Sequence, residues 1–222
     1  MTGISRKPEA DRLCNKAREL ERDGQFDAAL AAFRGAIALQ DDHYLSHFYL
    51  SLLLVRLDRL EEARVEALKA RIIHNNDAVS TEHHVTILSE LALRYAQALA
   101  LTPLLDIWRD LHRFGATEQD ALIEQFVLEN FISSEASLSQ VAAVYFEWGA
   151  HQQVIALCSD AIQAGIAASH VLHLQRAVSR IAIGELEAAY RDCIAGIERE
   201  PEEVAWWDVV LKTARSNGDG RR

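Results

Sequence analysis

Apolar residues recur along most of this chain at intervals of three and four, the spacing that places them on one face of a helix. Phe26, Ala29, Leu30, Phe33 and Ile37 illustrate the pattern. Only three prolines and ten glycines occur in 222 residues, few for a protein made of strands and tight turns. Alanine, leucine, glutamate and arginine, which favour helices, dominate instead. The sequence therefore predicts an all-α protein.

The helical pattern is broken by junctions at a regular spacing. Gly24 is placed where a left-handed residue would end one helix just before the next begins. Asp58 occupies the corresponding position 34 residues later, and Gly149 and Gly184 close helices in two further segments. A new run of small and apolar residues follows each junction. The chain is thus predicted to be a series of helix–turn–helix pairs.

These pairs resemble the tetratricopeptide repeat, a helix–turn–helix unit of 34 residues. Its frame fits four units and one degenerate unit, at 10–43, 44–77, 135–168 and 170–203, and at 85–118. The small residue that lets paired helices cross closely falls at Ala17, Ser51, Ala142 and Ala177, and at Ala92 in the degenerate unit. The resemblance implies a right-handed superhelical stack of antiparallel helix pairs.

The same frame predicts how the chain is divided. We expect a flexible N-terminus at 1–8, three units within 9–114, an extra helix or insertion at 115–134, and two units within 135–203. A capping helix is expected at 204–216, where Trp206 and Trp207 would cover the last apolar face. An aromatic cage is the alternative use of these tryptophans. Residues 217–222 are expected to be a disordered tail.

Charge limits the classes of partner. The net charge is -10, and residues 114–175 contain seven acidic residues but no Lys or Arg. Phosphate binding needs clustered basic residues, so we expect no nucleic-acid partner. The acidic segment is either a solvated face or an attractor for a basic partner. No apolar run approaches the roughly 20 residues that span a bilayer, so we expect no membrane partner.

Catalytic and metal-binding patterns are missing from the sequence. It contains no phosphate-binding glycine loop, GxSxG elbow or HExxH helix. His43 and His47 lie four apart on one predicted helix, but a metal site needs three or four converging ligands. Cys158 and Cys193 share a core position of the repeat, whereas Cys14 is expected to face the groove and to be the thiol worth testing. We expect no enzyme activity, no cofactor and no metal.

The resemblance implies that first helices line a concave groove, which commonly binds peptides or helices. The groove residues expected to contact a partner are Leu45, Phe48, Tyr49, Leu52, Val55, Glu90, Leu93, Phe146, Glu147, Val171, Leu174 and Val178. The carboxylate clamp of the family's chaperone-tail binders is absent, since Cys14, Arg18 and Tyr49 replace its lysine and asparagines. We expect a protein or peptide partner, amphipathic and bearing basic residues.

A non-enzymatic adaptor or chaperone that holds a client segment is the function predicted from this groove. The alternative is a homo-oligomeric scaffold that assembles through the same apolar patch. A further alternative is that the patch is not open, because residues 78–84, residues 118–132 or a second copy of the protein cover it. The chain has no secretory signal after Arg6 and Lys7, so a cytoplasmic location is expected. Arginine (19) far exceeds lysine (4), which favours a bacterial origin.

Overall fold

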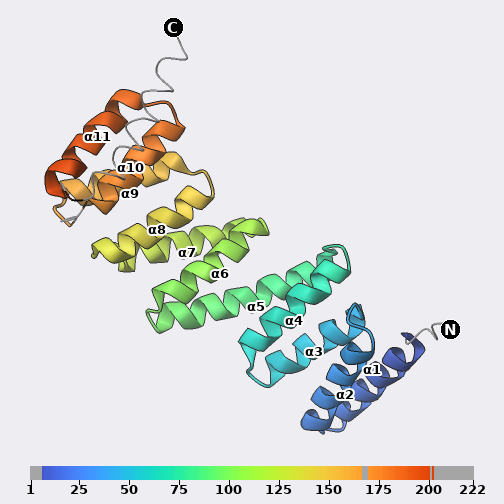
Figure 1. Cartoon of the computed structure of the whole chain (residues 1–222). Helices are drawn as coiled ribbons and strands as arrows, with labels where there is room; N and C mark the ends of the chain where they lie inside the picture. The colour runs from blue at the N-terminus through green and yellow to red at the C-terminus, as the bar shows by residue number, and fades with distance from the viewer. Residues whose placement is uncertain (1–6, 167–169, 201, 203–222) are drawn as a thin grey trace. The chain divides into compact units, whose positions relative to one another are not determined.

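The computed structural model describes residues 7–166, 170–200 and 202, and no strand occurs in those ranges. The helices of the first part are α1 (Lys7–Arg22), α2 (Phe26–Leu39), α3 (Tyr44–Arg56), α4 (Leu60–Ile73) and α5 (Ala78–Gln97). They are followed by α6 (Leu101–Arg113), α7 (Thr117–Asn130), α8 (Glu135–Glu147), α9 (His151–Gln163), α10 (Val171–Ala182) and α11 (Leu186–Arg199) (Figure 1). The all-α prediction is confirmed.

Four antiparallel pairs correspond to the four regular units: α1 with α2, α3 with α4, α8 with α9, and α10 with α11 (Figure 1). The small crossing residues Ala17, Ser51, Ala142 and Ala177 are all fully buried. A larger side chain at these positions would hold the two helices apart, because protein interiors have little free volume. The first helices of successive units also pack together, α1 with α3 and α8 with α10.

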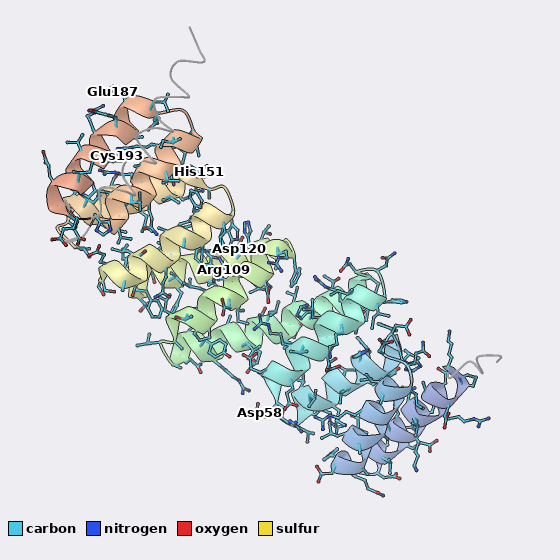
Figure 2. All side chains as sticks on the ribbon, viewed as in Figure 1. Asp58, Arg109, Asp120, His151, Glu187 and Cys193 are labelled. Atoms are coloured by element: carbon cyan, nitrogen blue, oxygen red, sulfur yellow. The ribbon has the colours of Figure 1, made fainter. Side chains whose placement is uncertain are left out.

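The turn between paired helices uses one left-handed residue. Gly24 has φ 76°, and the following amide of Gln25 donates to the carbonyl of Leu20 at 2.8 Å. Asp58, labelled in Figure 2, has φ 61° at the corresponding place in the second unit, and Arg59 donates to Leu54 in the same way. This bond satisfies a carbonyl that the helix end would otherwise leave unpaired.

The chain forms two compact units. One comprises Met1–Ala98 with Asp110–Asp120, and the other comprises Leu99–Arg109 with Ala121–Arg222. They are called here the N-terminal and the C-terminal unit. Helices α6 and α7 each contribute to both.

The N-terminal unit has a core built from the facing sides of its helix pairs, with Phe33, Leu53, Leu54 and Leu88 fully enclosed. Residues 78–84 do not form a separate segment, because they are the first turns of α5. Asp77 caps that helix by accepting hydrogen bonds from the amides of Val79 and Ser80.

The core of the C-terminal unit contains Trp108, which is fully buried, with its ring centroid 5.6 Å from that of Tyr145 and 5.0 Å from that of Trp148. Both contacts are edge-on, the arrangement that aromatic quadrupoles favour. In the α10–α11 pair the core is smaller. Ala177 and Cys193 form its buried centre, and Leu174 and Val178 pack against them.

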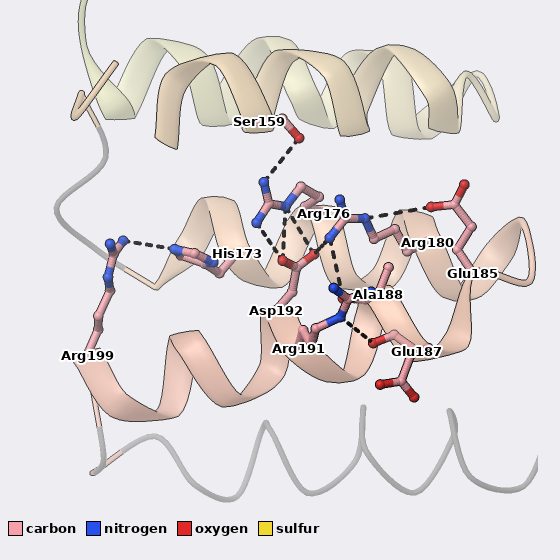
Figure 3. A network of polar contacts seen from close by, with 10 residues as sticks. All are labelled: Ser159, His173, Arg176, Arg180, Glu185, Glu187, Ala188, Arg191, Asp192 and Arg199. Carbon is pink, nitrogen blue, oxygen red and sulfur yellow. Dashed lines mark hydrogen bonds and ion pairs between the residues drawn. The ribbon is translucent and has the colours of Figure 1, made fainter. Parts of the chain in front are cut away.

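Two arginines replace apolar residues in the first helix of the last unit, and the structure shows why they are accommodated. Arg176 and Arg180 of α10 both bind Asp192 of α11, whose side chain is only 4% exposed (Figure 3). Arg176 also donates to Ser159 Oγ of α9 at 3.0 Å. The network therefore ties three helices together through one buried carboxylate.

The expected N-terminal segment 1–8 lies mostly outside the described residues, and the capping helix at 204–216 and the tail at 217–222 lie outside them entirely. Among the described residues, no helix combines the length and apolarity needed to cross a membrane.

Candidate functional site

Helix α3 carries more apolar residues than its core contacts require. Leu50, Leu53 and Leu54 are buried, yet a second row of apolar side chains runs along the other side of the helix. In this row Leu45 is 42% and Val55 36% exposed. The three residues between them, Phe48, Tyr49 and Leu52, are half-buried. These five residues, the α3 row, form a run of predicted groove residues that is exposed at both of its ends.

Side chains from the neighbouring first helices hold the aromatic members of the α3 row. Phe48 lies between Tyr44 and Tyr49, with ring centroids 5.7 Å away on each side. The guanidinium of Arg18 on α1 lies 4.2 Å above the Tyr49 ring. His83 on α5 approaches Phe48 edge-on, at 5.3 Å between ring centroids. The rings are thus fixed in place before any partner arrives, which lowers the entropy lost on binding.

These contacts also show how far other parts of the chain cover the α3 row. The first turns of α5 cover one edge of Phe48 through His83, as the alternative involving residues 78–84 anticipated. The cover is partial, because Leu45 and Val55 at the two ends of the row remain exposed. Burial also lowers the pKa of His83.

The two predicted groove residues on α5 differ in how readily a partner could contact them. Leu93 is 54% exposed, so it extends the accessible apolar surface of the N-terminal unit. Glu90 is exposed but lies 3.4 Å from Nε of Arg94, which in turn donates to Asp58 at 2.5 Å. Its charge is therefore shared with a base of the same chain, so its attraction for a partner is weakened.

The predicted groove residues of the C-terminal unit are less open. Leu174 and Val178 are half-buried against the Ala177–Cys193 core, and Val171 is half-buried as well. Glu147 is exposed but receives two hydrogen bonds from Arg109, at 2.7 and 3.2 Å. Phe146 is exposed, with its ring edge-on to that of His151.

The expectation for Cys14 was wrong. Its side chain is buried and does not line an open groove. Burial raises the pKa of this thiol, so it is poorly suited to act as a nucleophile. Burial likewise raises the pKa of Cys158 to about 12 and that of Cys193 to about 11. All three thiols act as small buried side chains.

The paired histidines of α3 and its N-terminal cap each have separate partners. His43 lies 2.7 Å from Ser46 Oγ and 2.9 Å from Asp11 Oδ1. His47 lies 2.5 Å from Glu66 and 2.9 Å from the carbonyl of Asp41. Each buried ring therefore links two helices through its hydrogen bonds. Within the described ranges, no three His, Cys, Asp or Glu residues converge as metal ligands would.

Two hollows among the described residues were not predicted from the first-helix frame, and three helices border each of them. One, about 470 Å³, is bounded by α2, α3 and α4. The other, about 400 Å³, is bounded by α7, α8 and α9.

The arrangement of first helices decides the fold type. In the N-terminal unit α1 and α3 pack side by side, and α5 reaches α3 through His83. Each first helix crosses its partner at a buried small residue, within units of the repeat length. The fold is tetratricopeptide-like. Its α5 is longer than a regular first helix, and α7 is an additional helix between two pairs.

No family model and no curated protein matches this tetratricopeptide-like sequence. Among solved structures, it is similar to a thermophilic tetratricopeptide repeat protein of Thermus thermophilus, with 14% identity, coverage of 92% of this chain and 98% of that one, and a TM-score of 0.35. A tetratricopeptide repeat protein of Parabacteroides merdae has 16% identity, coverage of 93% and 84%, and a TM-score of 0.35. The TPR2AB domain of yeast Sti1, in a complex with pHSP90, has 17% identity, coverage of 93% and 85%, and a TM-score of 0.39. The assignment of the fold rests on the repeat itself.

Proposed function

We propose that this protein is a non-enzymatic adaptor or chaperone that holds an apolar segment of a client protein on the α3 row. The observation that carries this proposal is the second apolar face of α3, which the core does not use. A row of aromatic and aliphatic side chains at helical spacing, open at both ends, has the character of an interaction site.

The client segment is expected to have aromatic or aliphatic anchors with Lys or Arg nearby. Apolar contacts with Phe48 and Leu52 would supply most of the affinity. The net charge of -10 would draw basic segments toward the protein, although Glu90 is partly neutralised by Arg94. Charge should therefore affect the association rate and its salt dependence more than the final affinity.

A peptide-display library selected on the purified protein tests the proposal. Enriched peptides are then titrated by fluorescence anisotropy against the wild type, Leu45→Glu and Phe48→Glu. We expect both variants to weaken binding by at least about 30-fold, the effect of losing a central contact of about 2 kcal/mol. Because Phe48 is half-buried, Leu45→Glu serves as the variant with less effect on folding.

Val65→Glu is the matched control, because Val65 is 49% exposed on the second helix α4. It should change the affinity by less than about twofold. Peptides that bind Phe48→Glu and Leu45→Glu as well as the wild type, or that prove acidic, would show that the α3 row is not the client site. Sedimentation tests the scaffold alternative: a stable oligomer that Phe48→Glu dissociates would mean that a second copy occupies the row.

A further inference from the structure

The hollow between α7 and α9 is lined mostly by apolar side chains. It lies wholly in the C-terminal unit and is about 400 Å³, within the size range of about 300–1,000 Å³ typical of binding pockets. Leu138 and Tyr145 of α8 are buried and form the floor. Leu128 on α7 and Leu157 on α9 also line it. The hollow is therefore suited to one or two large aliphatic or aromatic side chains.

Two carboxylates border this hollow, one on each wall. Glu124 of α7 accepts a hydrogen bond from the Tyr145 hydroxyl at 2.6 Å through Oε1. Asp160 of α9 is exposed on the opposite wall. In the part of the chain that the structure describes, neither carboxylate has an ion-pair partner. No Lys or Arg occurs from residue 114 to residue 175, so no base of that segment is able to reach them.

The hollow between α2 and α4 provides an internal comparison. It also has acidic residues at its border, but each is neutralised by a base of the same unit. Glu62 pairs with Arg34 and Arg59, and Glu66 pairs with Lys69. The two hollows are similar in volume but differ in charge, because bases of the same unit neutralise Glu62 and Glu66, whereas Glu124 and Asp160 form no ion pair among the described residues.

We propose that the hollow between α7 and α9 binds an amphipathic helix of a partner protein that inserts large apolar side chains between Glu124 and Asp160 and presents Lys or Arg to them. A helix is the form that suits this site, because the walls are two helices and the described residues offer no strand edge. Apolar residues at i and i+4, with a basic residue one turn away, match its floor and its two carboxylates. The site is independent of the α3 row, which lies in the other unit.

The test uses a synthetic peptide of about 18 residues, five helical turns, with a leucine stripe flanked by lysines. A second peptide carries glutamate in place of each lysine, and a third has the leucines scrambled around the helix. Binding to the full chain is measured by fluorescence anisotropy at low and high salt. We expect the lysine–leucine peptide to bind, and the other two to bind at least about tenfold more weakly.

Two substitutions examine the site itself. Ala156→Trp fills the hollow from its exposed border and should weaken binding about tenfold or more, whereas Gln152→Trp, exposed on α9 outside the hollow, should not. Glu124→Gln with Asp160→Asn should weaken binding several-fold at low salt and less at high salt. Glu118→Gln with Glu129→Gln removes the same charge from exposed positions of α7 and is the control.

Each outcome decides for or against the proposal. Equal weakening by both charge pairs would mean that the peptide responds only to net charge, and the proposal would fail. It would also fail if the lysine–leucine peptide did not bind, or if Ala156→Trp left its affinity unchanged. Binding that is lost in Phe48→Glu but kept in Ala156→Trp would place the peptide on the α3 row instead.

Discussion

Asp192 is the residue whose removal should most clearly destabilise the last helix pair. Its carboxylate accepts hydrogen bonds from Nε and Nη2 of Arg176, at 3.0 and 2.5 Å, and from Nη1 of Arg180, at 2.6 Å. The side chains of the two arginines are 13% and 18% exposed. Asp192→Ala would leave two guanidinium groups, both largely withdrawn from water, without their counter-charge.

The size of the effect follows from this burial. Removing one partner of a buried ion pair typically costs about 3–5 kcal/mol. The arginines retain some contact with water, and Arg180 lies 3.8 Å from the exposed Glu185, which offsets part of the loss. We therefore expect Asp192→Ala to lower the free energy of unfolding by about 3 kcal/mol. Asp192→Asn, which keeps the shape and one acceptor, should lower it by about 2 kcal/mol.

Urea unfolding followed by far-ultraviolet circular dichroism and by tryptophan fluorescence measures the change. Coincidence of the two signals is needed, because repeat proteins do not always unfold in one step. Glu198→Ala is the control, since Glu198 is exposed on the same helix and should change the stability by less than about 0.5 kcal/mol. If Asp192→Ala were as stable as this control, Asp192 would not be compensating the buried charges of Arg176 and Arg180.

An apolar replacement of the whole network separates charge from packing. Replacing Asp192, Arg176 and Arg180 together by leucine removes the charges along with their partner, and such replacements are often neutral or stabilising by about 1–4 kcal/mol. We expect the triple variant to be clearly more stable than Asp192→Ala. If it were equally unstable, lost packing would be the cause of the effect, and the uncompensated charge would not.

Two further predictions concern the cores. His84 is fully buried beside Arg71 and Phe114, and burial, aided by the Arg71 charge, lowers its pKa from 6.5 to about 4. The unfolded state therefore takes up a proton at this histidine at a higher pH than the folded state does, so the free energy of unfolding should decline from about pH 6.5 downward. In urea titrations, His84→Leu should reduce the loss of unfolding free energy between pH 7 and pH 5 by about 2 kcal/mol. A pH profile unchanged by the substitution would refute this prediction. Ala177→Leu should destabilise the protein by about 1–3 kcal/mol in thermal melts, because a larger side chain overpacks the close crossing of α10 and α11. Ala182→Leu, at an exposed position of the same helix, is the control and should have little effect. Equal melting temperatures of the two variants would show that the helices are not tightly packed at Ala177.

The local pattern of the sequence determined the helices, their pairing and their crossings. The period of the apolar residues predicted the helices of the regular units, and the small residues at Ala17, Ser51, Ala142 and Ala177 are buried as predicted. These features follow from sequence because they depend on contacts within one helix or between two consecutive helices, where spacing along the chain sets position in space. The same local frame located the apolar surplus of α3.

The tertiary structure alone decided which side chains of these helices remain available. Glu147 looked like a free acid, but Arg109, 38 residues earlier, binds it. Cys14 looked open to the groove but is buried. The hollow between α7 and α9 arises because an additional helix stands beside a regular pair, and among the described residues neither of its two carboxylates forms an ion pair. Exposure and charge compensation depend on residues distant in sequence, so a repeat pattern, which records only local spacing, does not contain them.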